Sequence, residues 1–291
     1  MKHSLPYILN LPPFTYRGID FNSKSFLYKI FFIIRGKILG FIINNFINNT
    51  FCFLINLFYP KKSKIYFEDN FYKKDIENFN TVIYPNKRIL RIIHHEDLFK
   101  RIYETYCLHH LNFEETDIVV DCGANVGELY LAFLFLDKNI KYIGIEPDLN
   151  TYECLIKNAK GENNKFFQIA LSDNKGNKEF YLDNYGGNSS LVKFDDVKSE
   201  TVPTDTIDNL RLSNKIKLLK IDAEGHELEV IKGAVTTIKD VEFISIDYGF
   251  EKGLDQSSTI VEVNNFLIEN DFELHKFSEF RLVGLYKNKI I

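Results

Sequence analysis

One short segment constrains the fold of this chain more than any other. An apolar run at residues 118–120 ends in Asp121, continues through Gly123 and Gly127, and passes straight into a second apolar run at 129–136. This order is typical of a buried strand, a tight glycine turn and the start of a helix. Such a turn presents backbone N–H groups and a helix N-terminus, so the segment predicts a site for a nucleotide-like ligand.

The spacing of the glycines indicates which ligand. A dinucleotide-binding turn has the pattern G-x-G-x-x-G, because its backbone must approach a pyrophosphate closely. Here Gly123 and Gly127 enclose Ala-Asn-Val, so the middle glycine is missing. A turn of this kind suits a ligand without a pyrophosphate. S-adenosylmethionine (SAM), with an amino-acid group in that place, is such a ligand.

An acid further along the chain supports a nucleoside. The apolar run at 142–145 ends in Glu146, and an acid about 20 residues after the turn can accept hydrogen bonds from both ribose hydroxyls. The turn alone is also compatible with a βαβ unit that binds nothing. Turn and acid together favour nucleoside binding.

Composition and charge limit the classes of function. The 291 residues, 45% of them hydrophobic, suffice for one large domain or one domain with an extension. The four cysteines are scattered without a C-x-x-C pair, which fits a reducing compartment, and no secretory signal is evident, so we expect a cytoplasmic protein. Residues 1–64 contain nine Lys or Arg and one acid, whereas the remainder is acidic. The acidic remainder lacks the clustered positive charge that nucleic acids require, and we expect no nucleic-acid partner.

The basic N-terminal segment is also rich in Phe, Ile and Leu. Residues 38–60 carry no charge, but five asparagines interrupt this run and would be costly inside a bilayer. On a helical wheel the asparagines gather on one side, which predicts an amphipathic helix. With its basic flanks, the segment at 24–64 suits an anionic membrane surface. A helical pair packed on the enzyme body or a partner subunit is an equally good interpretation, and a spanning helix is a third.

The rest of the chain predicts an α/β body. We expect a helical extension at 1–64, a mixed connector or cap packed on the body at 65–115, and the body at 116–291. The connector is expected to hold short strands at 65–68 and 88–93 and a helix at 97–111. The body alternates apolar runs with helical patterns, at 117–121, 141–146, 166–171, 216–221 and 241–246.

Three further features complete the predicted body. Residues 172–208 are rich in turn residues, including a loop at 185–188, and suggest a β insertion. The runs at 272–276 and 281–286 can pair as an antiparallel hairpin. Thr259 and Glu262 form a capping-box pattern ahead of a last helix. The alternation predicts a doubly wound, mostly parallel sheet with an antiparallel last strand.

Ionisable residues crowd the end of the predicted strand at 216–221. Within eight residues the chain carries Lys220, Asp222, Glu224, His226 and Glu227. In an open α/β sheet this end faces the ligand crevice. Solvated loop charge and a helix N-terminal acid account for Glu227, but they account poorly for Asp222 at the strand edge.

The next strand ends in Asp247, so Asp222 and Asp247 are expected on adjacent strand ends. They could serve as a base and an orienting group, or as oxygen ligands of a divalent metal. Two carboxylates alone are a weak metal signal, and we expect no metal site.

These motifs resemble the FkbM family of SAM-dependent methyltransferases. The resemblance runs from about residue 90 to 290 and is carried by residues 120–127, 146–148, 170–173, 189–191, 220–227 and 232–234. The Lys-Ile-Asp-x-Glu-Gly block at 220–225 is specific to that family. The resemblance implies the Rossmann-like class I methyltransferase fold with seven strands, and O-methylation, often of sugar hydroxyls. Asp247 stands where the family frequently has Glu, and residues 1–64 lie outside the family pattern.

Roles follow for individual residues. We assign the amino-acid end of SAM to the turn, with Asp121 beneath it: Gly123, Ala124, Asn125 and Gly127. The ribose is assigned to Glu146, and the adenine to Pro147, Ala170 and Leu171. A sugar hydroxyl is a poor nucleophile, so a base is useful, and Asp222 and His226 are the candidates. Glu224 could orient the substrate or cap the following turn.

The expected acceptor is a sugar hydroxyl in a glycan, a surface polysaccharide or a glycosylated natural product. One alternative is N- or carboxyl-methylation of a small metabolite. Another is a membrane-docked assembly protein whose SAM fold is vestigial. We expect a cytoplasmic location, with peripheral association at the inner face of the membrane as an alternative.

Overall fold

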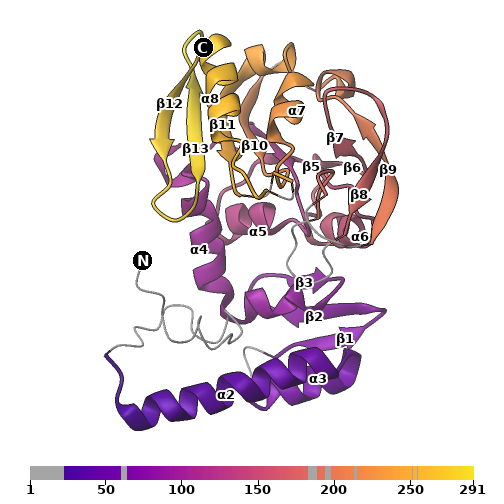
Figure 1. The fold of residues 1–291 in the computed structure, drawn as a ribbon, viewed down its shortest axis with the longest axis vertical. Helices are drawn as coiled ribbons and strands as arrows, with labels where there is room; N and C mark the ends of the chain where they lie inside the picture. The colour runs from indigo at the N-terminus through magenta and orange to yellow at the C-terminus, as the bar shows by residue number, and fades with distance from the viewer. Residues whose placement is uncertain are drawn as a thin grey trace. The chain divides into compact units, whose positions relative to one another are not determined.

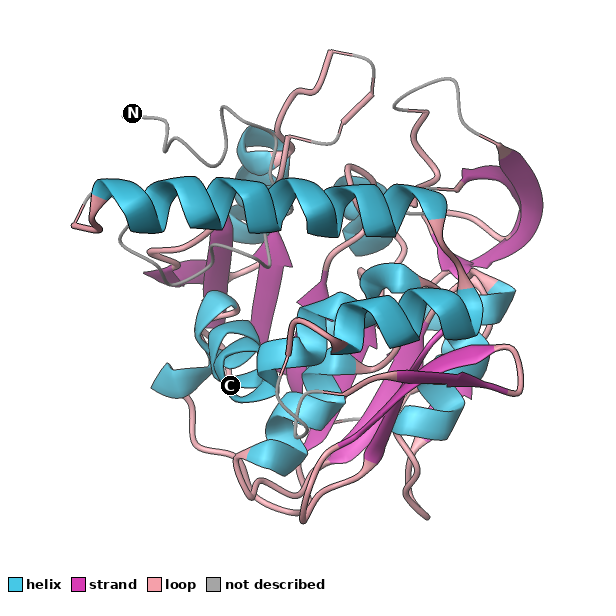
Figure 2. Ribbon diagram, turned by 90° about the horizontal axis from the view of Figure 1, so that it is seen from below, coloured by secondary structure: helices cyan, strands magenta, loops and turns pink. Residues whose placement is uncertain are grey.

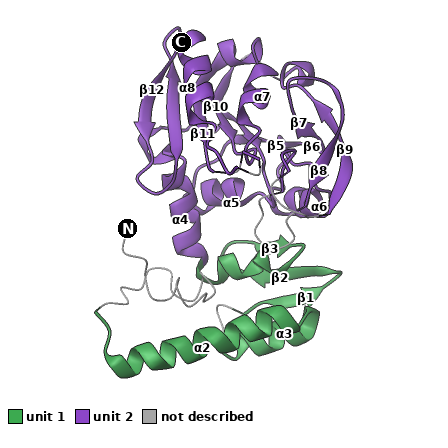
Figure 3. Ribbon diagram, viewed as in Figure 1, with its two compact units in different colours: residues 1–94 green, residues 95–291 purple. Residues whose placement is uncertain are grey.

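The computed structural model describes residues 23–59, 64–182, 189–193, 198–212, 215–250, 252–253 and 255–291. The chain divides into two compact units, residues 1–94 and 95–291 (Figure 3). The residues of the predicted connector are therefore shared between the two units, and the loop expected at 185–188 lies outside the described residues.

The first unit combines two helices with a small sheet. Helix α2 spans Phe26–Asn45 and α3 spans Asn48–Asn56. The antiparallel sheet has the order β1-β2-β3, with strands Tyr66–Glu68, Phe71–Asp75 and Thr81–Tyr84. Figures 1 and 2 show α2 and α3 side by side along one edge of the unit. Among the described residues, no helix combines the length and apolarity needed to cross a bilayer.

Two local predictions for this unit are wrong. The helix expected over 38–60 is broken at Phe46 and Ile47, which have extended backbone, before α3 begins. Residues 88–93 are not a strand but part of the 3-10 helix η3, Lys87–His94. The buried Lys74 amine donates to the carbonyls of Ile92 and Ile93 at 2.6 and 3.1 Å, which satisfies the end of this helix.

The second unit is built on a seven-stranded sheet of order β12-β13-β11-β10-β4-β5-β6 (Figure 1). Its strands are β4 Ile118–Cys122, β5 Lys141–Ile145, β6 Lys165–Phe167, β10 Ile216–Ile221, β11 Val241–Asp247, β12 Phe272–Phe277 and β13 Val283–Asn288. Strand β13 runs antiparallel to both of its neighbours. The doubly wound sheet with an antiparallel last strand is thus confirmed.

One helix of this unit precedes the sheet along the chain, and four helices follow β4, β5, β10 and β11. They are α4 His95–Thr105, α5 Glu128–Phe135, α6 Leu149–Asn158, α7 Glu227–Lys232 and α8 Ile260–Glu269. Strands β4, β10 and β11 are almost wholly buried, as apolar parallel strands covered on both faces should be. The helix expected over 97–111 is shorter, because α4 ends at Thr105 and Cys107 adopts a left-handed conformation before a 3-10 turn.

The predicted β insertion is present. The strand expected at 166–171 is two strands: β6 stays in the main sheet, and β7, Ala170–Leu171, leaves it. Strand β7 pairs with β9, Ser199–Asp205, which also pairs with β8, Gly176–Tyr181. Ala170 and Leu171 therefore lie where the chain passes from the sheet into the insertion.

Candidate active site

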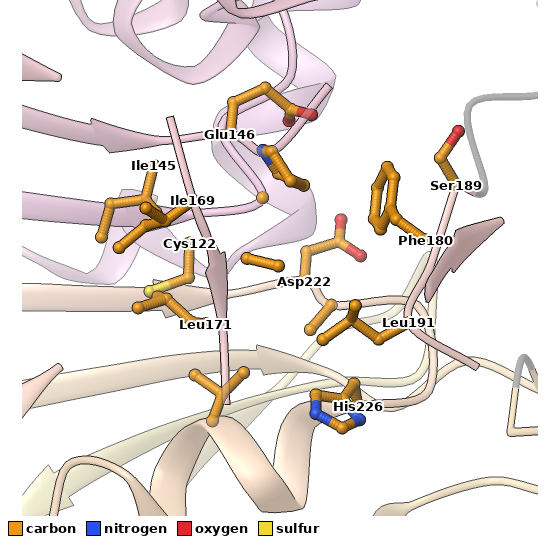
Figure 4. Close-up of a pocket in the computed structure, with 15 residues that line it drawn as sticks. Cys122, Ile145, Glu146, Ile169, Leu171, Phe180, Ser189, Leu191, Asp222 and His226 are labelled. Atoms are coloured by element: carbon orange, nitrogen blue, oxygen red, sulfur yellow. The ribbon is translucent and has the colours of Figure 1, made fainter. Parts of the chain in front are cut away.

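A pocket opens at the carboxyl ends of the central strands of the second unit (Figure 4). The space between its lining residues, which is open to solvent, is about 460 Å³. Gly123, Glu146 and Asp222 reach it from the ends of β4, β5 and β10. The apolar part of its wall comes from the main sheet and the insertion: Ile145, Ile169, Ala170, Leu171, Phe180 and Leu191. Strand order thus brings together both groups of residues that the sequence analysis singled out.

The glycine turn is shaped by a close backbone approach. Gly123 has φ +73°, and a Cβ atom there would lie 2.0 Å from the carbonyl oxygen of Asp222. The Asp222 N–H donates to the Cys122 carbonyl at 3.1 Å, which holds the two strand ends together. Gly127, at φ +86°, precedes α5 and packs against Leu155. Only glycine fits at position 123, for steric and for conformational reasons.

The turn does not offer the free N–H donors that the sequence suggested. Gly123 and Ala124 both donate to the Ile145 carbonyl, at 3.1 and 3.0 Å. Asn125, with φ +51°, donates to Glu146 Oε2 at 2.9 Å. The turn therefore contributes its shape and close packing, and its N–H groups are already paired within the protein.

Glu146 presents a buried carboxylate at the pocket wall, next to Pro147. Its Oε1 accepts a 3.1 Å hydrogen bond from the N–H of Asp148. Burial raises the pKa of Glu146 to about 7, although its backbone donors act in the opposite direction. A carboxylate with this placement is suited to accept hydrogen bonds from a ribose.

Beneath the turn lies a buried ion pair. Lys220 Nζ is 2.9 Å from Asp121 Oδ1, and the hydroxyl of Tyr142 donates to Asp121 Oδ2 at 2.5 Å. Lys220 also donates to the Gly123 carbonyl at 2.9 Å. Burial opposes the charge of Lys220, but the carboxylates of Asp121 and Asp222 raise its pKa, so the amine stays protonated. Asp121 thus supports the turn from below and does not line the pocket.

Asp222 combines contact with the pocket and a fixed orientation. Its Oδ2 accepts a 2.6 Å hydrogen bond from the hydroxyl of Tyr106 and lies 4.0 Å from Lys220 Nζ. The Tyr106 carbonyl in turn accepts a 3.0 Å hydrogen bond from the hydroxyl of Ser245. Burial and the carboxylates of Asp222 and Asp247 raise the pKa of Tyr106 well above its usual value, so it remains a donor.

Asp222 and Asp247 follow adjacent parallel strands, in which Ile221 lies opposite Ile246. Asp247 Oδ2 is 2.7 Å from the guanidinium of Arg281, which balances its charge. Across the described ranges, no group of three or more His, Cys, Asp or Glu could hold a metal ion.

His226 and Glu224 differ in their relation to the pocket. His226 lines the pocket (Figure 4), but its Nε2 is 3.0 Å from the hydroxyl of Ser172. Burial lowers the pKa of His226, which favours the neutral ring. Glu224 adopts a left-handed conformation at φ +50°, and its carbonyl accepts a hydrogen bond from Ser190. Its side chain is not part of the pocket wall.

Glu227 is a buried structural acid and not a solvated one. Its Oε1 accepts from the N–H groups of Ala223 and Gly225 at 3.2 and 2.9 Å, and its Oε2 accepts from the Thr259 hydroxyl at 2.8 Å. Thr259 is the N-cap residue of α8, but its side chain makes no capping hydrogen bond, so the capping box predicted with Glu262 does not form. The hydrogen bonds of Glu227 fix the loop that carries Asp222.

Sequence reasoning missed Tyr106 and Arg281. Tyr106 follows α4, 116 positions before its partner Asp222, and Arg281 lies between β12 and β13. No spacing rule links residues so far apart. The only available signal was the excess of carboxylates at the two strand ends, which called for nearby donors.

The strand order, the glycine turn after β4 and the acid after β5 define a class I SAM-dependent methyltransferase. The residues fit the cofactor, because Gly123 lets the ends of β4 and β10 approach each other at the pocket, Glu146 is placed for the ribose, and the apolar wall suits an adenine. The sequence model described as "Methyltransferase FkbM domain" matches residues 121–274, more than half of the chain. The chain belongs to the FkbM methyltransferase family.

Named relatives are distant. Hexuronic acid methyltransferase AglP of Haloferax volcanii is 27% identical over 139 residues, which cover 46% of this chain and 56% of the relative. Methyltransferase sdnD of Sordaria araneosa is 27% identical over 176 residues, 47% of this chain and 67% of the relative. The chain therefore spans little more than half the length of the Haloferax protein. A crystal structure of a SAM-dependent methyltransferase from Aquifex aeolicus matches 66% of this chain and 96% of its own, at 14% identity and a TM-score of 0.38.

Proposed function

We propose that this methyltransferase acts on a hydroxyl group of a sugar in a glycan, a surface polysaccharide or a glycosylated natural product. The observation that carries the proposal is the carboxylate of Asp222, which lines the pocket beside the glycine turn and is fixed by Tyr106. An oriented carboxylate at this place can take the proton of an acceptor hydroxyl. We further propose that the enzyme works in the cytoplasm.

The cofactor-binding residues are assigned on the same grounds. When bound, SAM supplies an electrophilic methyl group on a sulfonium. Glu146 would accept hydrogen bonds from its ribose, while Pro147, Ala170 and Leu171 would contact its adenine, since all four line the pocket. The turn from Gly123 to Gly127, supported by Asp121, would position its amino-acid end.

Asp222 is a better candidate than His226 for the base. His226 is held by Ser172, and burial lowers the pKa of its ring. We assign His226 to the pocket wall and Asp222 to proton removal. Glu224 has no assigned role in proton transfer, because its side chain is outside the pocket wall.

The acceptor class is supported by the Haloferax relative, whose name states that it methylates a hexuronic acid. The test is transfer of a labelled methyl group from SAM to neutral oligosaccharides, uronic-acid oligosaccharides, amines and carboxylic acids, with mass spectrometry of each product. The expected result is an added methyl ether on a sugar. Methylated amines or esters without any sugar ether would overturn the proposal.

A matched pair of variants tests the role of Asp222. Asp222→Asn should reduce methyl transfer by at least about a hundredfold while calorimetry shows that SAM still binds. His226→Asn should retain most of the activity. Full activity of Asp222→Asn would remove the assignment of the base.

A further inference from the structure

The first unit carries an exposed apolar surface whose residues are not among those that line the pocket. We call it the apolar face, and it consists of Phe26, Leu27, Tyr28, Ile30, Phe31, Ile34, Ile38, Phe41, Ile47, Phe53 and Leu57. These side chains are half of all exposed large hydrophobic residues in the described part of the chain. Scattered apolar residues are ordinary on a surface, but a concentration of this size on one helical pair marks an interaction site.

The side of α2 opposite the apolar face is packed against other residues of the first unit. It buries a stripe at helical spacing: Phe32, Gly36, Leu39 and Ile42. An ordinary surface helix covers its outer side with polar residues. Helix α2 instead has apolar residues on both sides, with Ile34 and Phe41 54% and 60% exposed on the outer one. Packing inside the unit therefore does not explain the apolar face.

Charge indicates which partner fits. Residues 21–67 contain seven Lys or Arg and no Asp or Glu. Three of these cations, Lys24, Lys29 and Lys37, lie in α2 or directly before it, whereas Arg35 donates to the Phe58 carbonyl at 3.1 Å and is bound within the unit. Apolar side chains among cations are complementary to anionic lipid, where the side chains enter the acyl boundary and the cations meet phosphate groups. A second copy of the chain would place the same positive charges opposite each other, which opposes association.

We propose that the apolar face docks the protein on the surface of an anionic phospholipid bilayer, with α2 lying in the plane of the interface. The 20 residues of α2 give a contact about 30 Å long. Arg35 and Lys37, near the middle of the helix, oppose insertion across the bilayer. This mode of binding agrees with the finding that no described helix meets the requirements for a membrane span.

Flotation of the full chain with vesicles tests the proposal. The vesicles contain phosphatidylcholine with or without phosphatidylglycerol. The variant Ile34→Ser/Phe41→Ser removes two large side chains from the apolar face, and its control is Val261→Ser/Ile268→Ser on α8, where both side chains are also exposed. Wild type and control should float with the anionic vesicles, and the floated fraction of the test variant should be at least about fivefold lower. Added salt should release the wild type.

Circular dichroism and thermal unfolding of the full chain show whether both double variants are folded, because SAM binding reports only on the second unit. If Ile34→Ser/Phe41→Ser does not fold, Ile34→Ser alone carries the test, with a smaller loss of flotation expected. The proposal would be overturned if the folded variant floated to the same extent as the wild type. It would also be overturned if the wild type did not float with anionic vesicles. A dimer in analytical ultracentrifugation that this variant dissociates would also overturn it, because a second copy would then cover the face.

Discussion

The hydroxyl of Tyr106 donates a 2.6 Å hydrogen bond to Asp222, across 116 positions of sequence. Tyr106→Phe should lower the rate of methyl transfer about tenfold, because the carboxylate loses its orientation, while SAM affinity stays unchanged. Steady-state kinetics and calorimetry measure the two effects. Tyr103→Phe is the control, since its buried hydroxyl has no hydrogen-bond partner among the described residues. Equal losses in both variants would show that Tyr106 only contributes packing.

Lys220 should be far more important for stability than Lys217 on the same strand. Lys220→Met leaves the carboxylate of Asp121 buried without its cation, which should cost about 3–5 kcal/mol of the free energy of unfolding. Lys217 pairs with Glu242 at 2.9 Å in a more exposed place, so Lys217→Met should cost about 1 kcal/mol or less. Urea unfolding measures both. Similar losses would mean that the buried pair is not needed to hold the glycine turn.

The acids of the site show how much of it could be predicted from the sequence. Asp121, Glu146 and Asp222 stand at the ends of apolar runs, so the sequence predicted them at the carboxyl ends of parallel strands, and they lie at the ends of β4, β5 and β10. The pattern of apolar residues is local, and it fixes the strands and their common edge. The fold and the acidic half of the site were therefore predictable.

The partners of those acids were not predictable. Tyr106 and Arg281 come from a helix end and a hairpin turn, and only the folded backbone brings them to the strand ends. Likewise, the N–H groups of the glycine turn looked available in the sequence. Their pairing with Ile145 depends on how closely β4 and β5 approach each other, which residue spacing does not encode.

Glu146 should make SAM binding depend on pH. Burial raises its pKa to about 7, and the protonated acid accepts fewer hydrogen bonds from the ribose. SAM affinity should therefore fall about tenfold between pH 8 and pH 6. Calorimetry of Glu146→Gln is the control, because the variant retains any titration of SAM itself. The same slope in wild type and variant would exclude Glu146 as its source.

The raised pKa of Glu146 also affects the stability of the ligand-free enzyme. Glu146 has a usual pKa of 4.5 and a folded-state pKa of about 7, so its contribution to folding is complete below pH 4.5 and is lost as pH rises through 7. The full effect is about 3 kcal/mol. Relative to wild type, Glu146→Gln should therefore gain stability between pH 5 and pH 8 in urea unfolding. A difference independent of pH would contradict the raised pKa.

Gly123 is the position where one added methyl group should have the greatest effect on the site. In Gly123→Ala the new Cβ would lie 2.0 Å from the Asp222 carbonyl oxygen, so the ends of β4 and β10 must separate. We expect a loss of about 3 kcal/mol or more in the free energy of unfolding, with loss of SAM binding. Gly176→Ala is the matched control, because its Cβ meets only Thr204 Oγ1 at 3.8 Å. Thermal unfolding and calorimetry test both variants, and a Gly123→Ala protein that binds SAM normally would show that the turn can open without harm to the cofactor site.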